Sequence, residues 1–302
     1  MSTDFGTVFG DLKSSFGLAK HNILSYFLAN LGMVLVLIVL LVAIMIPVSI
    51  IAMAAYGIMG PGFGPMMVTW AVQNPLVVGG TAILVVIPII SIFLVVVGSI
   101  YGMTNDLVTT GETKAENAFS HFRAKFISFI SAGAMLTIVI FVPQLVVWGL
   151  ASNMFAYTVV GLPAQILAAF SFVWTFITLG LTSMVLPAVV SGKGVQEAFH
   201  ESFRLAAQRF DRVFGLLTSI VVLAAATLAP MMIWGLASGW AMNPFSPVQI
   251  AAVAIVGVWT LFALVMWVFI LYPMVIIAFV RVYHEITDGQ VASARQAEIR
   301  IA

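Results

Sequence analysis

The chain has 302 residues, of which 62% are hydrophobic and 8% charged, whereas an ordinary soluble domain is about a quarter charged. This composition excludes a water-soluble monomer, because the polar residues are too few to cover the apolar ones. The net charge of +1 gives no basic field to attract nucleic acid, and the absence of cysteine excludes disulfides and thiolate metal sites.

The apolar residues form six long runs without charge, each long enough to cross a bilayer core of roughly 20 residues. We expect helices, because unpaired backbone groups are not tolerated in hydrocarbon. The first run is too long for the core of a signal peptide, so we expect it to be retained. The predicted membrane helices cover residues 23–55, 75–104, 127–149, 159–190, 213–236 and 248–282.

Proline and glycine punctuate these runs. Gly111, Gly192 and Gly289 fall where helices should end. Proline inside a helix removes a backbone hydrogen bond, so each proline within or near a run is expected to kink or locally unwind its helix. These prolines are Pro47, Pro88, Pro143, Pro187, Pro230 and Pro273.

Charged residues occur only at the termini and in the second and fourth connections. The other three connections, near 56–74, 150–158 and 237–247, contain none. Since Lys and Arg in short loops stay in the cytoplasm, we predict a multi-pass protein of the cell membrane with both termini cytoplasmic. Aromatic residues are predicted to mark the outer boundary (Tyr56, Trp70, Trp148, Tyr157, Trp234 and Trp240) and the inner one (Tyr26, Tyr101 and Tyr283).

Two short segments recur along the chain. Residues 148–152, Trp-Gly-Leu-Ala-Ser, return as residues 234–238, and residues 15–19, Ser-Phe-Gly-Leu-Ala, resemble residues 202–206. We therefore predict an all-α integral membrane protein of six transmembrane helices. It forms a single membrane domain over 1–302, built from three parallel repeats of an interfacial amphipathic helix plus two spans. The repeat units cover about 1–110, 111–191 and 192–302, and a pseudo-threefold arrangement is one way to pack them.

The predicted interfacial helices carry phenylalanine at helical spacing opposite charged residues, as in helices that lie in the bilayer interface. One interpretation is that they anchor and orient the spans. The other is that they dock a cytoplasmic or membrane protein partner. The residues of this candidate face are Phe9, Phe16, Phe119, Phe122, Phe199 and Phe203.

The fourth span is the most polar, with hydroxyl residues at steps of four, three and four along one helix face. Such hydroxyls commonly bind backbone or join neighbouring helices. The alternative is a solvated path or a substrate cavity. The residues of this hydroxyl stripe are Ser171, Thr175, Thr178 and Thr182.

The sequence favours no enzyme and no cofactor. His200-Glu201 and His284-Glu285 lack the second histidine of a zinc protease helix, and no serine has the glycines of a nucleophile elbow. The four histidines all fall near the predicted cytoplasmic boundary, so a metal cluster is a third hypothesis, weaker than amphipathic side chains at that boundary.

The segment 202–206, the span after it, and the glycine-bounded segment 98–102 followed by Gly111 resemble a group of polytopic membrane families. These include uncharacterised six-helix proteins common in archaea and the membrane domain found with some bacterial glycerophosphodiester phosphodiesterases. The resemblance implies a six-helix membrane module. In that group the phosphodiesterase chemistry belongs to a separate soluble domain, which this sequence lacks, so no catalytic residue carries over.

Together these patterns favour a non-catalytic scaffold or accessory subunit of a membrane complex, in contact with lipid and with a cytoplasmic or membrane protein. The alternative is a component of a transporter or channel for an uncharged or lipophilic solute. The proline-broken spans and the hydroxyl stripe motivate this alternative.

Overall fold

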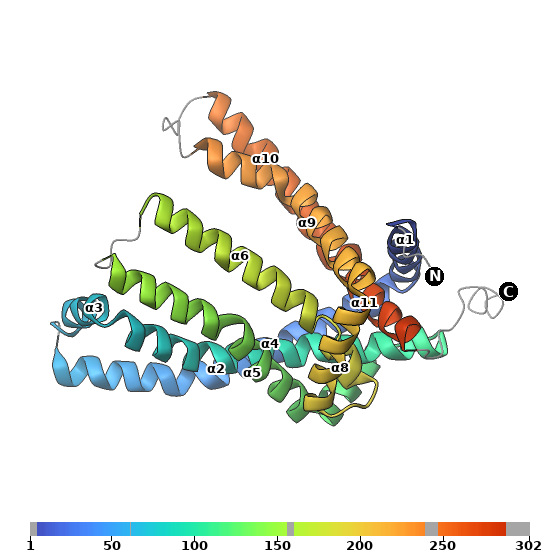
Figure 1. Ribbon diagram of the computed structural model, residues 1–302, viewed down its shortest axis with the longest axis horizontal. Coiled ribbons are helices and arrows are strands. Elements are labelled where there is room, and N and C mark those ends of the chain that lie inside the picture. The colour runs from blue at the N-terminus through green and yellow to red at the C-terminus, as the bar shows by residue number, and fades with distance from the viewer. Residues whose placement is uncertain (1–4, 61, 156–159, 239–246, 288–302) are drawn as a thin grey trace. The chain divides into compact units, whose positions relative to one another are not determined.

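The computed structural model of the protein describes residues 5–60, 62–155, 160–238 and 247–287, and all secondary structure in these residues is helical (Figure 1). The elements are α1 Phe5–His21, α2 Ile23–Met59, α3 Phe63–Gln73, α4 Pro75–Thr110, α5 Ala115–Met154, α6 Leu162–Thr182, α7 Val185–Val190, α8 Val195–Gln208, α9 Phe210–Ser238, α10 Pro247–Met266, the π-helical turn η1 Trp267–Leu271 and α11 Tyr272–Ile286.

Among the described residues, six helical segments are long and apolar enough to cross a membrane, the number that the sequence predicts. Their most apolar windows have mean hydropathies from 1.9 to 3.3. Each segment contains most of the corresponding predicted run. The segments are Ile23–Ile58, Val77–Thr110, Ala115–Met154, Leu162–Val190, Phe210–Trp234 and Val253–Ile286.

The third span differs from its prediction because no connection separates it from the helix before it. The interfacial helix expected around Phe119 and Phe126 is the first part of α5, and Lys125 interrupts the helical backbone with φ −119° and ψ 18°. A charged residue at the start of an apolar run therefore marks a kink here, rather than a helix end.

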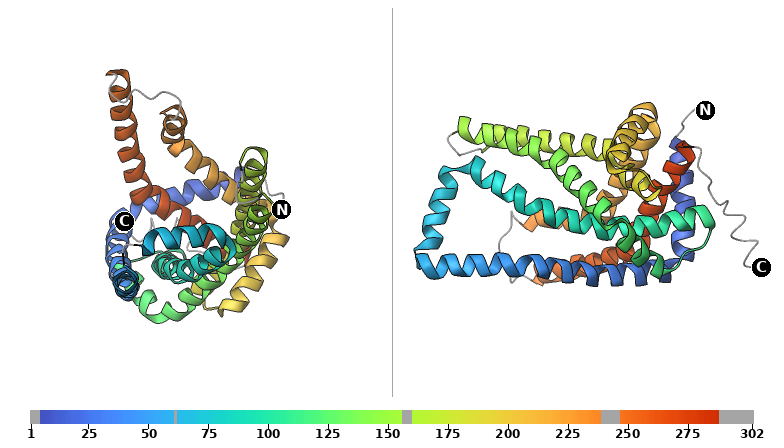
Figure 2. Two further views of the ribbon diagram at one scale, coloured as in Figure 1. Left: turned by 90° about the vertical axis from the view of Figure 1, so that its left-hand side faces the viewer. Right: turned by 90° about the horizontal axis from the view of Figure 1, so that it is seen from below.

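The connection between the first two spans also contains a helix, which the sequence did not predict. After Gly60, whose φ is 73°, the chain forms α3, which lies crosswise between the far ends of α2 and α4 (Figure 2). A left-handed residue is needed to turn the chain out of α2, and glycine adopts that conformation without strain.

Two spans are interrupted just before a proline. The fourth divides at Ser183 and Met184 into α6 and α7, and Pro187 lies in α7. The sixth changes to the π-helical turn η1 before Pro273, which stands in the first turn of α11. Because proline lacks an N–H, the carbonyl one turn earlier has no helical partner, and a local change of winding accommodates it.

The predicted glycine helix ends are confirmed at two positions. Gly111 and Gly192 have φ of 83° and 103°, the left-handed conformation that closes a helix. Gly289 lies outside the described residues, as do Tyr157 and Trp240. Tyr26, Tyr101 and Tyr283, predicted to mark the inner boundary, are buried within the protein. An aromatic residue near the end of a span reveals its depth, but not whether lipid or protein covers it.

The chain divides into two compact units. The first comprises residues 1–28, 104–115 and 205–302. In it, α1 packs mainly against α11 and also against α9 and η1, while α10 packs against α9. Its core contains Tyr26, Leu216 and Ile277, each exposed by less than 2%.

The second compact unit comprises residues 29–103 and 116–204. Its core is closed by glycines at which helices meet. A Cβ on Gly98 would come within 2.5 Å of the Phe129 ring, and one on Gly133 within 2.6 Å of the Ser91 backbone. These contacts bring α4 and α5 into close approach, as small residues do between membrane helices.

Replacing Gly133 by alanine is expected to lower the free energy of unfolding by about 1–3 kcal/mol, because the atom that a new methyl group meets belongs to the Ser91 backbone and cannot rotate away. Gly80→Ala is the matched control, since nothing lies within 4 Å of a Cβ there. Unfolding in detergent, followed by circular dichroism, measures both. Equal stability of the two variants would contradict the close packing of α4 on α5.

Candidate functional site

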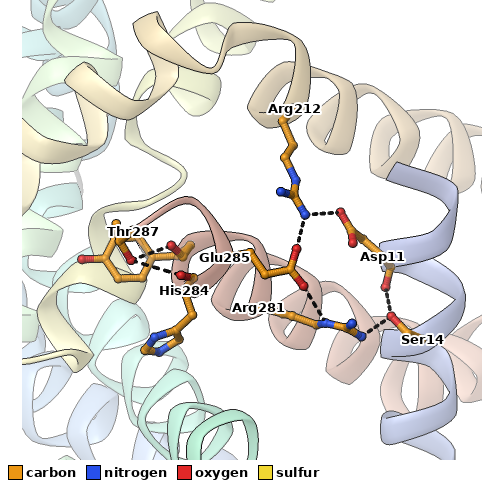
Figure 3. A network of polar contacts seen from close by, with 8 residues as sticks. Asp11, Ser14, Arg212, Arg281, His284, Glu285 and Thr287 are labelled. Carbon is orange, nitrogen blue, oxygen red and sulfur yellow. Dashed lines mark hydrogen bonds and ion pairs between the residues drawn. The ribbon is translucent and has the colours of Figure 1, made fainter. Parts of the chain in front are cut away.

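A network of charged side chains fastens α1 to α9 and α11 in the first compact unit (Figure 3). The guanidinium of Arg212, in the first turn of α9, donates to Asp11 of α1 at 3.1 Å and also to Glu285 of α11. Arg281 donates through Nε to Glu285 at 3.0 Å and through its terminal nitrogen to the Ser14 hydroxyl. Two cations and two anions from three helices thus pair with one another, while Nε of Arg212 is buried without a hydrogen-bond partner among the described residues.

Burial makes this network electrostatically costly. Asp11 is only 8% exposed, and loss of water raises the pKa of its carboxyl group above the ordinary value, while the positive charge of Arg212 acts in the opposite direction. A buried ion pair adds little net stability relative to apolar packing, but removal of one partner leaves an uncompensated charge. The network therefore fixes the position of α1 against α9 and α11 more than it adds to the free energy of unfolding.

Neutral hydrogen bonds extend the same unit. The His284 ring bonds to the Asn105 side-chain oxygen at 2.8 Å, and the Tyr26 hydroxyl bonds to Thr104 at 2.8 Å. Thr287 donates to the Tyr283 carbonyl at 2.8 Å, which closes the last turn of α11. The bonds of His284 and Tyr26 join the end of α4 to α11 and to the start of α2. Polar contacts thus connect the network on α11 to two further helices.

In the second compact unit, polar side chains repair the interrupted fourth span. The Ser202 hydroxyl of α8 donates to the Leu181 carbonyl at 2.6 Å and accepts from the Met184 N–H at 3.2 Å. At the end of α7, the Lys125 ammonium donates to the carbonyls of Val189 and Val190 at 2.8 and 2.7 Å. Backbone groups that the break leaves without helical partners are thereby satisfied.

The predicted hydroxyl stripe is fully hydrogen-bonded within the protein. Ser171 accepts from the Trp148 indole at 2.9 Å, and Thr175 accepts from the Gln144 amide at 3.0 Å, so both join α6 to α5. Thr178 and Thr182 each donate to the carbonyl one turn earlier, at 2.7 Å. This arrangement favours the first interpretation of the stripe, in which the hydroxyls join helices.

The structure divides the candidate phenylalanine face. Phe9, Phe16 and Phe119 are exposed by 74%, 40% and 42%. Phe122 and Phe203 are half-buried, and Phe199 is buried at 4%. Helical spacing identifies the apolar side of a helix, whereas burial depends on what packs against it. The first three expose most surface to lipid or a partner, and Phe199 exposes almost none.

The histidines do not gather into a cluster. In the part of the chain that the structure describes, no group of three or more histidine, aspartate or glutamate side chains is placed to hold a metal ion. His284 bonds to Asn105, and the His121 ring lies against Gly102. The metal hypothesis therefore gains no support from the positions of these two side chains.

Sequence reasoning missed the charged network. Arg281 and Glu285 stand four positions apart in α11, a spacing that indicates a helical ion pair. Asp11 and Arg212 gave no such local signal, because they meet only when α1 packs beside α9. The even number of predicted spans between them, which places both on the same side of the membrane, was the available clue.

Six long apolar helices, with polar groups paired at their ends, define the class as a polytopic α-helical membrane protein. No known protein family, curated protein or solved structure matches the chain.

Replacing Arg212 by glutamine is expected to destabilise the protein by about 2–4 kcal/mol, because Asp11 and Glu285 lose the cation between them. Arg209→Gln, which removes an exposed charge three residues earlier, is expected to change stability by less than about 0.5 kcal/mol. Denaturation monitored by tryptophan fluorescence compares the two. If both variants unfold together with the unaltered protein, the network does not hold α1.

Proposed function

We propose that the protein is a non-catalytic scaffold or accessory subunit of a membrane complex, with both termini in the cytoplasm. The observation that carries the proposal is the Asp11–Arg212–Glu285 network, which uses charged groups to seat α1 on α9 and α11. Catalytic charges need access to a substrate, whereas these three charged side chains pair with one another. The network serves to hold a helix in place.

The surface held in this way supports the assignment. Phe9 is 74% exposed on α1, and Phe16 is 40% exposed on the same helix. Two large apolar side chains exposed on one helix are typical of a surface that contacts lipid or another protein. A helix fixed by a buried network loses little further freedom on binding, so a partner meets a preformed surface.

A second line of support concerns the threefold repeat. The Trp174 indole donates to the Ile140 carbonyl at 3.1 Å, and the Trp259 indole donates to the Thr227 carbonyl at 2.9 Å. Ile140 and Thr227 each precede a proline, Pro143 or Pro230, by three positions. In each pair the second span thus supplies an indole to a backbone carbonyl in the turn before a proline of the first span, and the same hydrogen bond occurs in two proposed repeat units.

The recurring Ser-Phe-x-Leu-Ala segments add a further correspondence. Ser202 bridges the interruption between α6 and α7. Its counterpart Ser15 is fully buried on α1, and α1 packs against η1, the interruption of the sixth span. In both proposed repeat units, a serine of this motif thus lies on the helix that packs against an interrupted span. We take this as support for a shared ancestral unit of one interfacial helix and two spans.

The test is purification of the full chain from its native membrane in mild detergent, with identification of what remains bound. We expect one stoichiometric protein partner, and Phe9→Ala is expected to reduce its recovery by about tenfold or more, as loss of a central apolar anchor does. Phe172→Ala is the matched control, because Phe172 is comparably exposed at 65% on a membrane span. A chain that always purifies alone, or equal loss in both variants, would argue against the scaffold role.

A transporter or channel component is the second candidate, and the two interrupted spans favour it. Breaks within membrane helices are typical of transporter sites, because they expose backbone groups to a solute. Here one break lies between α6 and α7, and another is η1. Thr178 and Thr182 stand beside the first of them on α6, largely buried.

For this candidate, Thr178→Val is expected to slow the flux of an uncharged solute such as glycerol into proteoliposomes while leaving the unfolding midpoint unchanged. The substitution keeps the shape and removes a hydroxyl that donates only to its own helix. Thr81→Val is the control, because Thr81 makes the same bond on the exposed side of α4. Flux equal to that of protein-free vesicles, or equal in both variants, removes the case for transport.

A further inference from the structure

A surface hollow of about 630 Å³ lies on the first part of α5, before the kink at Lys125. Its lining combines the apolar ring of Phe119, the hydroxyl of Ser120, the guanidinium of Arg123 and the methyl group of Ala124. The hollow is wide open rather than enclosed, so a ligand held here stays partly exposed. A cation and a hydroxyl beside an aromatic ring provide for a ligand that is anionic at one end and apolar at the other.

Arg123 is the cation available to such a ligand. It is exposed, and within the described residues its guanidinium takes part in no ion pair. Its neighbour Lys125 is engaged with the carbonyls of Val189 and Val190. An arginine fork matches the oxygens of a phosphate with two parallel hydrogen bonds, which a single ammonium group cannot do.

The position of the hollow along α5 matches the depth of lipid headgroups. Lys125 is the last charged residue of the helix, and residues 126–154 are free of charge. Arg123 therefore stands where the polar part of α5 gives way to the part that crosses the membrane. At this level an arginine side chain reaches headgroup phosphates, and an aromatic ring in the interface packs against the carbons beside them.

We propose that the hollow formed by Phe119, Ser120, Arg123 and Ala124 is a binding site for the phosphate headgroup of an anionic phospholipid. The inference rests on the proposed function, because it places this part of α5 at the cytoplasmic leaflet, where anionic lipids are enriched. Arg123 holds the phosphate, the Ser120 hydroxyl donates to a further oxygen, and Phe119 packs beside the glycerol and acyl carbons. A lipid bound here fixes the depth of α5 in the membrane.

The test measures lipid binding to the purified chain by native mass spectrometry, with phosphatidylglycerol, phosphatidylcholine and inorganic phosphate as separate probes. We expect preference for phosphatidylglycerol over phosphatidylcholine, and loss of about tenfold in its affinity in Arg123→Gln, as for one charge-assisted contact. Lys114→Gln, which removes an exposed lysine outside the hollow, is expected to keep the preference. Arg123→Lys keeps the charge without the fork and is expected to bind with intermediate affinity.

Equal binding of both lipids, or unchanged binding in Arg123→Gln, overturns the proposal. Displacement of the lipid by inorganic phosphate at comparable concentration overturns it in favour of a soluble phosphate ligand. Circular dichroism shows whether Arg123→Gln is folded, and if it is not, Arg123→Lys alone decides through loss or retention of the preference. The purified chain is tested without any partner, so failure of the scaffold role leaves this measurement intact.

Discussion

The bilayer core offers no water to a polar group, so polar groups within a span need hydrogen-bond partners inside the protein. Backbone groups satisfy this constraint by forming helices, since each helical N–H finds a carbonyl within the same segment. Where a helix is interrupted, a side chain from elsewhere takes over: Ser202 bonds both sides of the break between α6 and α7, and Lys125 caps the end of α7. Trp174 and Trp259 donate to carbonyls in the turn before a proline. The interruption of the fourth span is thus compensated, and the positions of Ser202 and Lys125 follow from it.

Charge obeys the same constraint more strictly. Asp11 and Arg212 are removed from water only because they meet each other and Glu285. The raised pKa of Asp11 shows that pairing does not fully offset its desolvation. The network joins a helix at the start of the chain to α9 and α11, some two hundred residues later. It adds a directional contact to the apolar packing of α1.

The sequence predicts those features of the structure that depend on one segment alone, and it does not predict those that depend on contacts between distant segments. The number of spans was predictable, because length and hydropathy belong to each segment by itself. The glycine ends at Gly111 and Gly192 were predictable for the same reason, since a left-handed residue is a local requirement. The continuity of α5 through Lys125 was not, because the contact that holds this lysine lies in α7. The burial of Phe199 was not predictable, since periodicity shows which side of a helix is apolar without showing what covers it.

The hydrogen bonds of the hydroxyl stripe bear most directly on the choice between a scaffold and a transporter or channel component. A path for a solute needs polar groups whose bonds to the protein are weak enough to exchange for bonds to the solute. Ser171 and Thr175 accept from donors on the facing helix, Trp148 and Gln144, so a solute that displaced them would leave an indole and an amide without partners. Thr178 and Thr182 keep acceptor capacity while they donate to their own helix, but they lie buried where α6 ends. Ser171 and Thr175 therefore join two spans. The turn of Thr178 and Thr182, beside the break that Ser202 bridges, is the part of the stripe that has the chemistry a transported solute would need.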